Sequence, residues 1–286
     1  MTNRTKSSWL NEVFFTLKTQ VWVWVALVAG LVVTAGPFLW MVSTSFKFPA
    51  QQFDGSLLPW PITLNNYIRL FTSAPYLLAE VYNSLEVSVL STVGQVLTCA
   101  MAGFAFSVFQ FRGRNFLFGV LLLTLVIPPQ VTLIPNFIIF SHLGLIGTKI
   151  PLWIVSFLGG AFGTFLLRQY FASIPFELAE AARMDGASLM RIFVRIYFPL
   201  SKPALSALAI LTFTGSWNEL IRPLVYLPSN QKLTTLTVGL SLYQAQYSGQ
   251  WSFLMACAVI SILPILLVFL VAQKQIIEGS ALTGIK

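Results

Sequence analysis

The chain has 286 residues, of which 56% are hydrophobic and 9% charged, a composition that excludes an ordinary soluble domain, where about 25% of residues are charged. The formal net charge of +8 comes from basic residues scattered over short loops without interleaved aromatics, which indicates membrane topology and argues against a nucleic-acid partner. One histidine and two isolated cysteines argue against a metal centre or a disulfide framework.

Six apolar stretches, each close to the ~20 residues that cross a bilayer, predict an all-α integral membrane protein with six transmembrane helices. These stretches cover residues 21–42, 85–109, 116–140, 150–171, 204–227 and 251–273. We therefore expect a transmembrane domain over residues 21–273, preceded by a cytoplasmic segment, 1–20, and followed by a cytoplasmic tail, 274–286. The first apolar run lacks a clear cleavage site, so it is expected to be retained as a span.

The first two spans are joined by a polar, proline-containing segment, residues 43–80, which we expect to form an extracytoplasmic flap. Small and hydroxyl residues along the second span place it inside the helix bundle. Pro128 and Pro129 interrupt the third span, which is either a broken helix that lines a pathway or a packed kink. The fourth span carries three glycines as sites of close helix approach: Gly159, Gly160 and Gly163.

Polar residues lie near the outer end of the fifth span. Because ionisable residues within a span are functional candidates, Asn218 and Glu219 join Pro128 and Pro129 as candidate pathway residues. The structural alternative, which we favour, is that Glu219 pairs with Arg222 along one helix face.

The distribution of basic residues predicts the orientation of the chain. With six spans and a cytoplasmic N-terminus, twelve of the seventeen lysines and arginines fall on the cytoplasmic side. This bias predicts that both termini are cytoplasmic. It also places the segment between the fourth and fifth spans in the cytoplasm.

That segment, residues 173–203, contains two short helical patterns. Ser173 can cap the first helix, which is expected to stop at Gly186, because glycine adopts the left-handed conformation at little cost. Ser188 is expected to start a second helix that ends before Pro199. Alanines beside the turn are small enough to let another backbone approach closely, so the sequence predicts a compact docking elbow.

The sequence contains no recognisable catalytic machinery. A single histidine, His142, cannot build a catalytic triad, and the tail GSALTGIK fails as a phosphate-binding loop because Ile285 stands where lysine is required. Acidic and histidine relays within the spans, which would indicate a gradient-driven carrier, are almost absent. We therefore expect a translocation subunit without catalytic residues or metal ligands, driven by a separate subunit docked on the elbow.

The string EAARMDGASLMRIFVRIYFPLSKPAL, from Glu180 to Leu205, resembles the EAA signature of the membrane subunits of bacterial ABC importers, in particular the carbohydrate branch with the maltose-type second permease. Phe198 stands where that family often has leucine, which keeps the apolar character. Further strings similar to that branch are NSLEVSV, IPPQVTLIP, GTFLLRQYF, WNEL and EGSALTGIK. The resemblance covers nearly the whole chain from about Asn83.

The resemblance implies a type I ABC importer permease in the bacterial inner membrane. Its implied partners are a homologous second permease, two ABC ATPases that hold ATP and Mg²⁺, and an extracytoplasmic solute-binding protein. This chain itself would bind no cofactor. The elbow would be the coupling helix seated on the ATPase, with these contact residues: Glu180, Ala181, Ala182, Asp185 and Gly186.

The resemblance also implies that the segment 231–250 reaches the binding protein and helps to release its sugar. Four aromatic and amide residues there suit a sugar or a protein contact, or alternatively an interfacial aromatic belt: Tyr243, Gln244, Gln246 and Tyr247. The expected function is the permease subunit of an ATP-driven sugar importer. A permease for glycerol-phosphate or another polyol, a gradient-driven carrier or channel, and a membrane enzyme are the alternatives.

Overall fold

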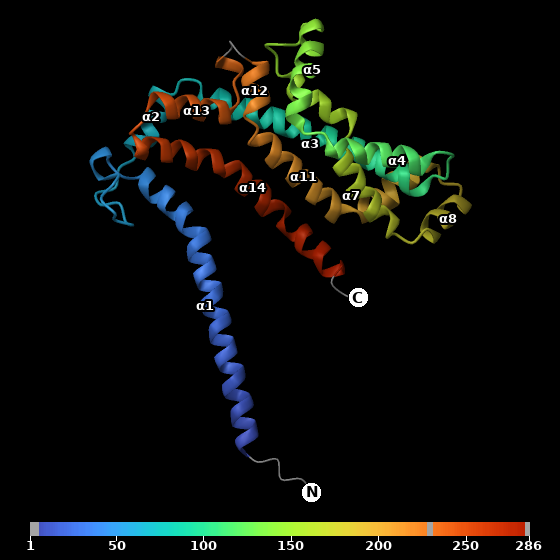
Figure 1. The fold of residues 1–286 in the computed structure, drawn as a ribbon, viewed down its shortest axis with the longest axis horizontal. Helices are drawn as coiled ribbons and strands as arrows, with labels where there is room; N and C mark the ends of the chain where they lie inside the picture. The colour runs from blue at the N-terminus through green and yellow to red at the C-terminus, as the bar shows by residue number, and fades with distance from the viewer. Residues whose placement is uncertain (1–5, 228–230, 284–286) are drawn as a thin grey trace. The chain divides into compact units, whose positions relative to one another are not determined.

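The computed structural model describes residues 6–227 and 231–283, and every element within those ranges is helical (Figure 1). Arg4 and Lys286, two of the basic residues on which the orientation prediction rests, lie outside the described residues, as does Ile285 of the tail. The chain divides into two compact units: a flap unit, residues 1–70 and 247–259, and a helical unit, residues 71–246 and 260–286.

The flap unit contains one long helix and a short irregular segment. Its elements are α1 (Lys6–Ser45), η1 (Pro49–Gln51), most of α2 (Asn65–Ser73) and the beginning of α14 (Trp251–Thr283). Helix α1 includes most of the segment expected to precede the first span, and Pro37 lies within it. Between α1 and α2 the backbone is irregular, and polar side chains hold it in place.

The helical unit contains the remaining elements. They are α3 (Leu77–Val108), α4 (Arg114–Leu123), η2 (Thr124–Val126), α5 (Pro129–His142), α6 (Ile150–Trp153), η3 (Ile154–Leu158), α7 (Ala161–Ala172), α8 (Glu177–Met184), α9 (Leu189–Ile192), the π-helix η4 (Phe193–Tyr197), α10 (Phe198–Leu200), α11 (Lys202–Trp217), α12 (Ile221–Tyr226), η5 (Gln231–Leu233), α13 (Leu236–Gln246) and the rest of α14.

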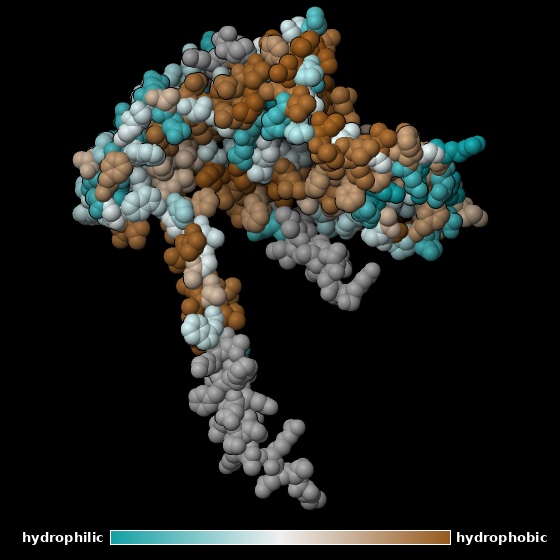
Figure 2. Space-filling view, in the orientation of Figure 1, coloured by the Kyte–Doolittle hydropathy of each residue, from teal (hydrophilic) through white to brown (hydrophobic). Residues whose placement is uncertain are grey.

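Within the described residues, four helical segments are long and apolar enough to cross a membrane, and the number rises to six if each of two bent helix pairs counts as one span. The four are Gln20–Ser45, Leu77–Val108, Ile150–Ala172 and Trp251–Val271. One bent pair coincides with the predicted third span, and the other joins the second elbow helix, Leu189–Leu200, to Lys202–Trp217, which covers only the first part of the predicted fifth span. Figure 2 shows the expected surface for the helical unit, with hydrophobic side chains over its middle and hydrophilic ones at the end that carries α8.

Helix α3 is the centre of the helical unit and packs against α7 and α11, as the small residues of the second span predict. The contact with α7 depends on Gly163. A Cβ there would lie 2.7 Å from the Cys99 sulfur and 3.0 Å from a methyl group of Leu208, so only glycine fits without a shift. Cys99 is fully buried and free, as expected from its isolation in an apolar run.

Three predicted spans are not continuous helices. The fourth passes from α6 into η3, and Gly159, at φ +83°, separates η3 from α7. The third bends by 98° between η2 and α5, and Pro128 and Pro129 form the start of α5. The fifth ends as α11 at Trp217, so the prediction of one helix over 204–227 is wrong. A polar side chain accompanies the break: the Glu219 carboxylate accepts from the backbone amides of Ile221 and Arg222, which a continuous helix would pair with its own carbonyls.

The second span begins earlier than hydropathy predicts, at Leu77 rather than residue 85. The polar residues that hid this start have hydrogen-bond partners inside the helical unit, as described below.

Candidate functional site

The elbow between α7 and α11 is a helix, a glycine turn and a second helix. Two hydrogen bonds close α8, from the Gly186 amide to the Arg183 carbonyl (3.0 Å) and from the Ala187 amide to the Ala182 carbonyl (2.9 Å). With Gly186 at φ +78°, this is the Schellman arrangement that ends many helices. The predicted left-handed stop at Gly186 is therefore confirmed.

Of the other predicted boundaries of the two elbow helices, one is confirmed and two are wrong. Ser188 caps α9, since its hydroxyl accepts from the Arg191 amide. The prediction that Ser173 caps the first elbow helix is wrong, because Ser173 ends α7 and its hydroxyl donates to the Tyr170 carbonyl. The second helix also does not end before Pro199, which lies within α10. Residues 189–200 form one uninterrupted helical run, so Pro199 lies one residue before its end, and the chain bends only after Leu200.

The inner face of the elbow is fixed to the helical unit by apolar packing. Ala179 is 1% exposed, and Phe193 and Tyr197 of the second elbow helix are buried with it. Both rings contact Phe104 of α3, at centroid distances of 5.2 and 5.0 Å, and Phe171 of α7 packs on Tyr197 at 5.7 Å. The π-helix widens the turn at this point. The elbow is thus joined to α3 and α7 by a buried aromatic cluster.

The outer face of the elbow carries four of the five predicted coupling residues. Glu180, Ala181, Asp185 and Gly186 are exposed, whereas Ala182 is half-buried against the apolar cluster. Large apolar side chains lie exposed around them, Met184 at 89% and Met190 at 63%. Exposed apolar side chains beside acidic ones are typical of a surface that another protein covers.

The four candidate pathway residues occupy two helix breaks. Pro128 and Pro129 lie at the exposed bend between η2 and α5. Glu219 pairs with Arg222 at 3.1 Å, which is the structural alternative that the sequence favoured. Within the described residues, no hydrogen bond joins the prolines to Asn218 or Glu219, so their role in a pathway stays a prediction.

The segment 231–250 contributes its four predicted residues in different ways. Tyr243, Gln244 and Gln246 belong to α13, and Tyr247 follows its end. The Tyr243 side chain is buried and its hydroxyl donates to both carboxylate oxygens of Glu80 (3.1 and 3.0 Å). Gln244 and Gln246 are exposed. Of the four, the two glutamines are therefore the most accessible to a partner.

A polar network that sequence reasoning missed anchors this segment to the first turns of α3. Asn83 donates to the carbonyls of Lys232 and Thr234 (2.9 and 3.1 Å), and the Ser84 hydroxyl accepts from the Leu236 amide (2.8 Å). Asn83 also accepts from Lys149, at 3.0 Å. The signal was present in the string NSLEVSV, which is unusually polar for a helix that continues into a span.

Lys149, in the loop before α6, contacts two polar side chains of α3, Asn83 and Glu86. Its ammonium group pairs with Glu86 and lies 5.5 Å from the centre of the Tyr82 ring. Glu80, which is 3% exposed, lines a pocket of about 300 Å³ together with Tyr243 and Gln246. The start of α3 is thus a polar anchor for both the loop before α6 and the segment before α14.

No group of three or more histidine, cysteine, aspartate or glutamate residues that could hold a metal ion occurs within the part of the chain that the structure describes. The helical unit thus carries an elbow with an exposed face at one end of α3 and a polar hydrogen-bonded segment at the other.

Comparison with known families gives a match over most of the bundle. The family described as "Binding-protein-dependent transport system inner membrane component" matches residues 95–278. The arabinooligosaccharides transport system permease protein AraQ of Halalkalibacterium halodurans is 34% identical, over 87% of this chain and 90% of that protein. The sn-glycerol-3-phosphate transport system permease protein UgpE of Brucella abortus is 31% identical, over 88% of this chain and 93% of that protein.

A solved structure shows the same fold. It is one chain of the crystal structure of a bacterial ABC transporter involved in the import of the acidic polysaccharide alginate. That chain superposes with a TM-score of 0.79 and is 25% identical, covering 96% of this chain and 99% of the other.

Proposed function

Because the chain belongs to the family of binding-protein-dependent transport system inner membrane components, we propose that it is the permease subunit of an ATP-driven sugar importer. The fold is that of a type I ABC importer permease, all-helical over the described residues. The observation that carries the proposal is the exposed elbow, whose signature sequence lies inside the matched region and whose inner face is fixed to the bundle.

The proposed complex contains a second, homologous permease, two ABC ATPases and an extracytoplasmic solute-binding protein in a bacterial inner membrane. ATP and Mg²⁺ belong to the ATPases, and this chain binds neither. Both chain termini and the elbow face the cytoplasm in this proposal, on the strength of the lysine and arginine distribution.

In the proposed mechanism the elbow transmits ATPase movement to the bundle. Glu180, Ala181, Asp185 and Gly186 form the contact surface, and Ala182 lets α8 lie close to the apolar cluster beneath it. Because Phe193 and Tyr197 pack on Phe104, a shift of the elbow moves α3 with it rather than bending a loose loop. The bundle then alternates between inward-open and outward-open states.

Sugar is the proposed substrate class because several relatives are named as transport systems for oligosaccharides or lactose. The relative named for sn-glycerol-3-phosphate makes a polyol phosphate the second candidate. The exposed Gln244 and Gln246 suit contact with the binding protein. Replacing both with alanine is expected to reduce uptake without affecting assembly, and unchanged uptake would remove them from the proposal.

The test is the ATPase activity of the reconstituted complex with its solute-binding protein, measured across a panel of sugars, polyols and their phosphates. Stimulation by one sugar class supports the proposal, and stimulation by a polyol phosphate alone replaces it with the second candidate. Failure of any ATPase to assemble on the permease pair would overturn the role of the elbow.

A further inference from the structure

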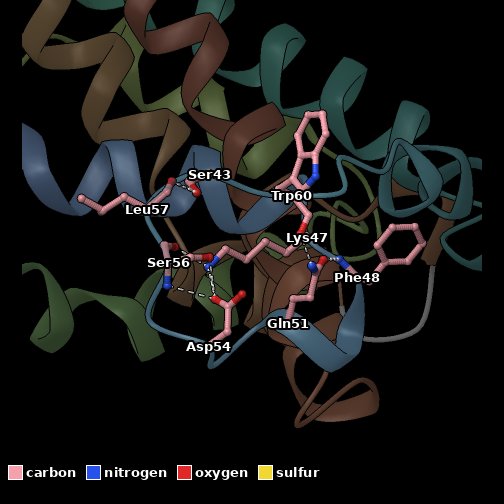
Figure 3. Close-up of polar contacts among 8 residues, drawn as sticks. All are labelled: Ser43, Lys47, Phe48, Gln51, Asp54, Ser56, Leu57 and Trp60. Atoms are coloured by element: carbon pink, nitrogen blue, oxygen red, sulfur yellow. Dashed lines mark hydrogen bonds and ion pairs between the residues drawn. The ribbon is translucent and has the colours of Figure 1, made fainter.

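The flap unit has its own polar framework, which has no role in the proposal above. Its centre is Lys47, whose side chain is 0% exposed and whose ammonium group donates to the Asp54 carboxylate (2.7 Å) and the Ser56 carbonyl (2.5 Å) (Figure 3). The Ser56 amide and hydroxyl donate to the same Asp54 oxygen, at 3.0 and 2.8 Å. A buried lysine with these acceptors fixes the path of the irregular segment between α1 and α2.

Other amide side chains complete the framework. Asn66 of α2 donates to the carbonyls of Ser45 and Lys47 (2.9 and 2.8 Å), which ties α2 to the end of α1. Gln51 donates to the Trp60 carbonyl at 2.6 Å and accepts from the Phe48 amide, as Figure 3 also shows. The flap is therefore a preformed platform rather than a loose connector.

The side chain of the next residue, Gln52, forms hydrogen bonds with a turn that lies about 200 residues later in the chain. Its amide nitrogen donates to the Gly249 carbonyl (2.9 Å), and its amide oxygen accepts from the Trp251 amide (2.9 Å). One side chain thus satisfies one acceptor and one donor on either side of Gln250. This two-point contact fixes both the position and the orientation of the turn.

Arg69 of α2 makes a second clamp on the same turn. Its guanidinium donates to the Gln250 side chain (2.8 Å) and lies 5.3 Å from the centre of the Phe253 ring. Phe253 is buried, and its ring packs against Tyr247 at 4.7 Å. Gln52 and Arg69 therefore hold residues 249–251 of the turn, and the Phe253 ring packs on Tyr247 at its start.

The clamped turn, residues 247–251, closes with a hydrogen bond from the Gln250 amide to the Tyr247 carbonyl (3.0 Å). Gly249 has φ +89°, as the third position of such a turn requires. Ser248 and Gly249 at its tip are exposed, and Trp251 is 41% exposed. The turn presents its tip outward while its base is fixed.

We infer that Gln52 and Arg69 are positioning residues that hold the turn 247–251 ready for the solute-binding protein. The inference rests on the proposed function, in which the segment before the last span reaches that protein. If a flexible turn becomes ordered only when its partner binds, the entropy lost on ordering weakens the binding. A turn that is already held in the bound conformation avoids that loss. Gln52 and Arg69 thereby tune recognition of the binding protein through the turn that they hold.

The test compares three alanine variants in the full reconstituted complex: Gln52→Ala, Gln250→Ala and the control Asn65→Ala. The control removes an exposed amide from the same unit. Gln250→Ala releases the Arg69 clamp without altering the flap framework, which covers the case in which Gln52→Ala disturbs the flap. The readout is ATPase activity against the concentration of sugar-loaded binding protein, with basal activity measured alongside.

We expect the half-saturating concentration of binding protein to rise about tenfold for Gln52→Ala and a few-fold for Gln250→Ala, as the loss of one or two hydrogen bonds predicts. Basal and maximal ATPase rates should match the parent, and Asn65→Ala should be unchanged. Unchanged half-saturation in both variants overturns the inference. So does a fall in basal and maximal rates at constant half-saturation, which identifies a purely structural role. If the parent complex is not stimulated by any binding protein, the proposed function fails first, and the inference with it.

Discussion

Replacing Gly186 with valine is expected to weaken ATPase docking or to abolish substrate-stimulated ATP hydrolysis, while the permease still folds and inserts. The residue ends α8 at φ +78°, a conformation that costs an ordinary L-residue about 1–2 kcal/mol. A free-energy change of that size shifts a local equilibrium by a factor of roughly 5–30. The substitution would therefore lower the population of the intact turn relative to the opened turn by that factor.

The structure separates this backbone effect from a steric one. A Cβ at Gly186 meets nothing within 4 Å in this chain, so a side chain causes no clash inside the permease. Asparagine tolerates the left-handed region better than alanine or valine. If backbone strain alone matters, Gly186→Asn should be nearly neutral and Gly186→Ala intermediate. If all three variants fail alike, the open space is occupied by the docked ATPase.

The assay is basal and substrate-stimulated ATPase activity of the reconstituted complex, with copurification of the ATPase as the control for docking. We expect Gly186→Val to assemble less ATPase or to lose stimulation, with unchanged amounts of permease in the membrane. Normal substrate-stimulated hydrolysis by Gly186→Val would refute the coupling role of this turn.

Three further predictions follow from the packing and the polar contacts. Gly163→Ala should destabilise the α3–α7 contact by about 1–3 kcal/mol because its Cβ would overlap the facing sulfur, whereas Gly119→Ala, in open space, should not; thermal unfolding in detergent compares them. Hydrogen bonds from the buried lysine and from Ser56 hold the pKa of Asp54 below its ordinary value near 3.8, so its stabilisation of the flap is present above that value and is lost as the pH falls through the lowered pKa. Hydrogen exchange of the flap between pH 6 and pH 3 should show this loss, which Asp54→Asn should abolish; equal profiles would contradict it. Tyr243→Phe removes the hydroxyl that donates to the buried Glu80 and should cost about 1–3 kcal/mol of stability; no change in thermal unfolding would show that another donor serves the carboxylate.

The parts of the fold that depend on local chemistry could be predicted from the sequence. Gly186 and Ser188 mark the elbow turn because a left-handed stop and a helix cap depend on one or two adjacent residues. The prediction that Ser173 caps the first elbow helix was wrong because a serine can stand at the end of one helix as well as at the start of the next. The bend at Pro128 was visible for the same local reason, but the sequence left open whether it was a kink or a full break.

The break after Trp217 could not be predicted from hydropathy, because the residues on both sides are apolar. It is accompanied by the side chain of Glu219, which accepts from backbone amides that a continuous helix would satisfy itself. The pairing of Glu219 with Arg222 was predicted, since it needs only a three-residue spacing. Its consequence for the helix was missed, because the same carboxylate also takes the backbone amide of Ile221.

The candidate outer site was the least predictable part, because its contacts join residues far apart in the chain. Nothing local to Gln52 indicates that it bridges Gly249 and Trp251, and nothing near Glu80 indicates Tyr243. A single sequence shows polar residues at such positions but not their partners. Hydropathy even excluded Glu80 from the second span, although the helix there is continuous.

Because α3 starts early, at Leu77, it contacts both the elbow and the segment before the last span. Near one end, Phe104 packs against the rings of the elbow, and near the other, Glu80 and Asn83 hold the segment before the last span. Phe104 and Glu80 are separated by roughly 36 Å along an unbroken helix at about 1.5 Å per residue. One continuous helix therefore joins the elbow to the segment before α14. In the proposed mechanism, the polar start of α3 is the part of the second span that carries an elbow displacement to that segment.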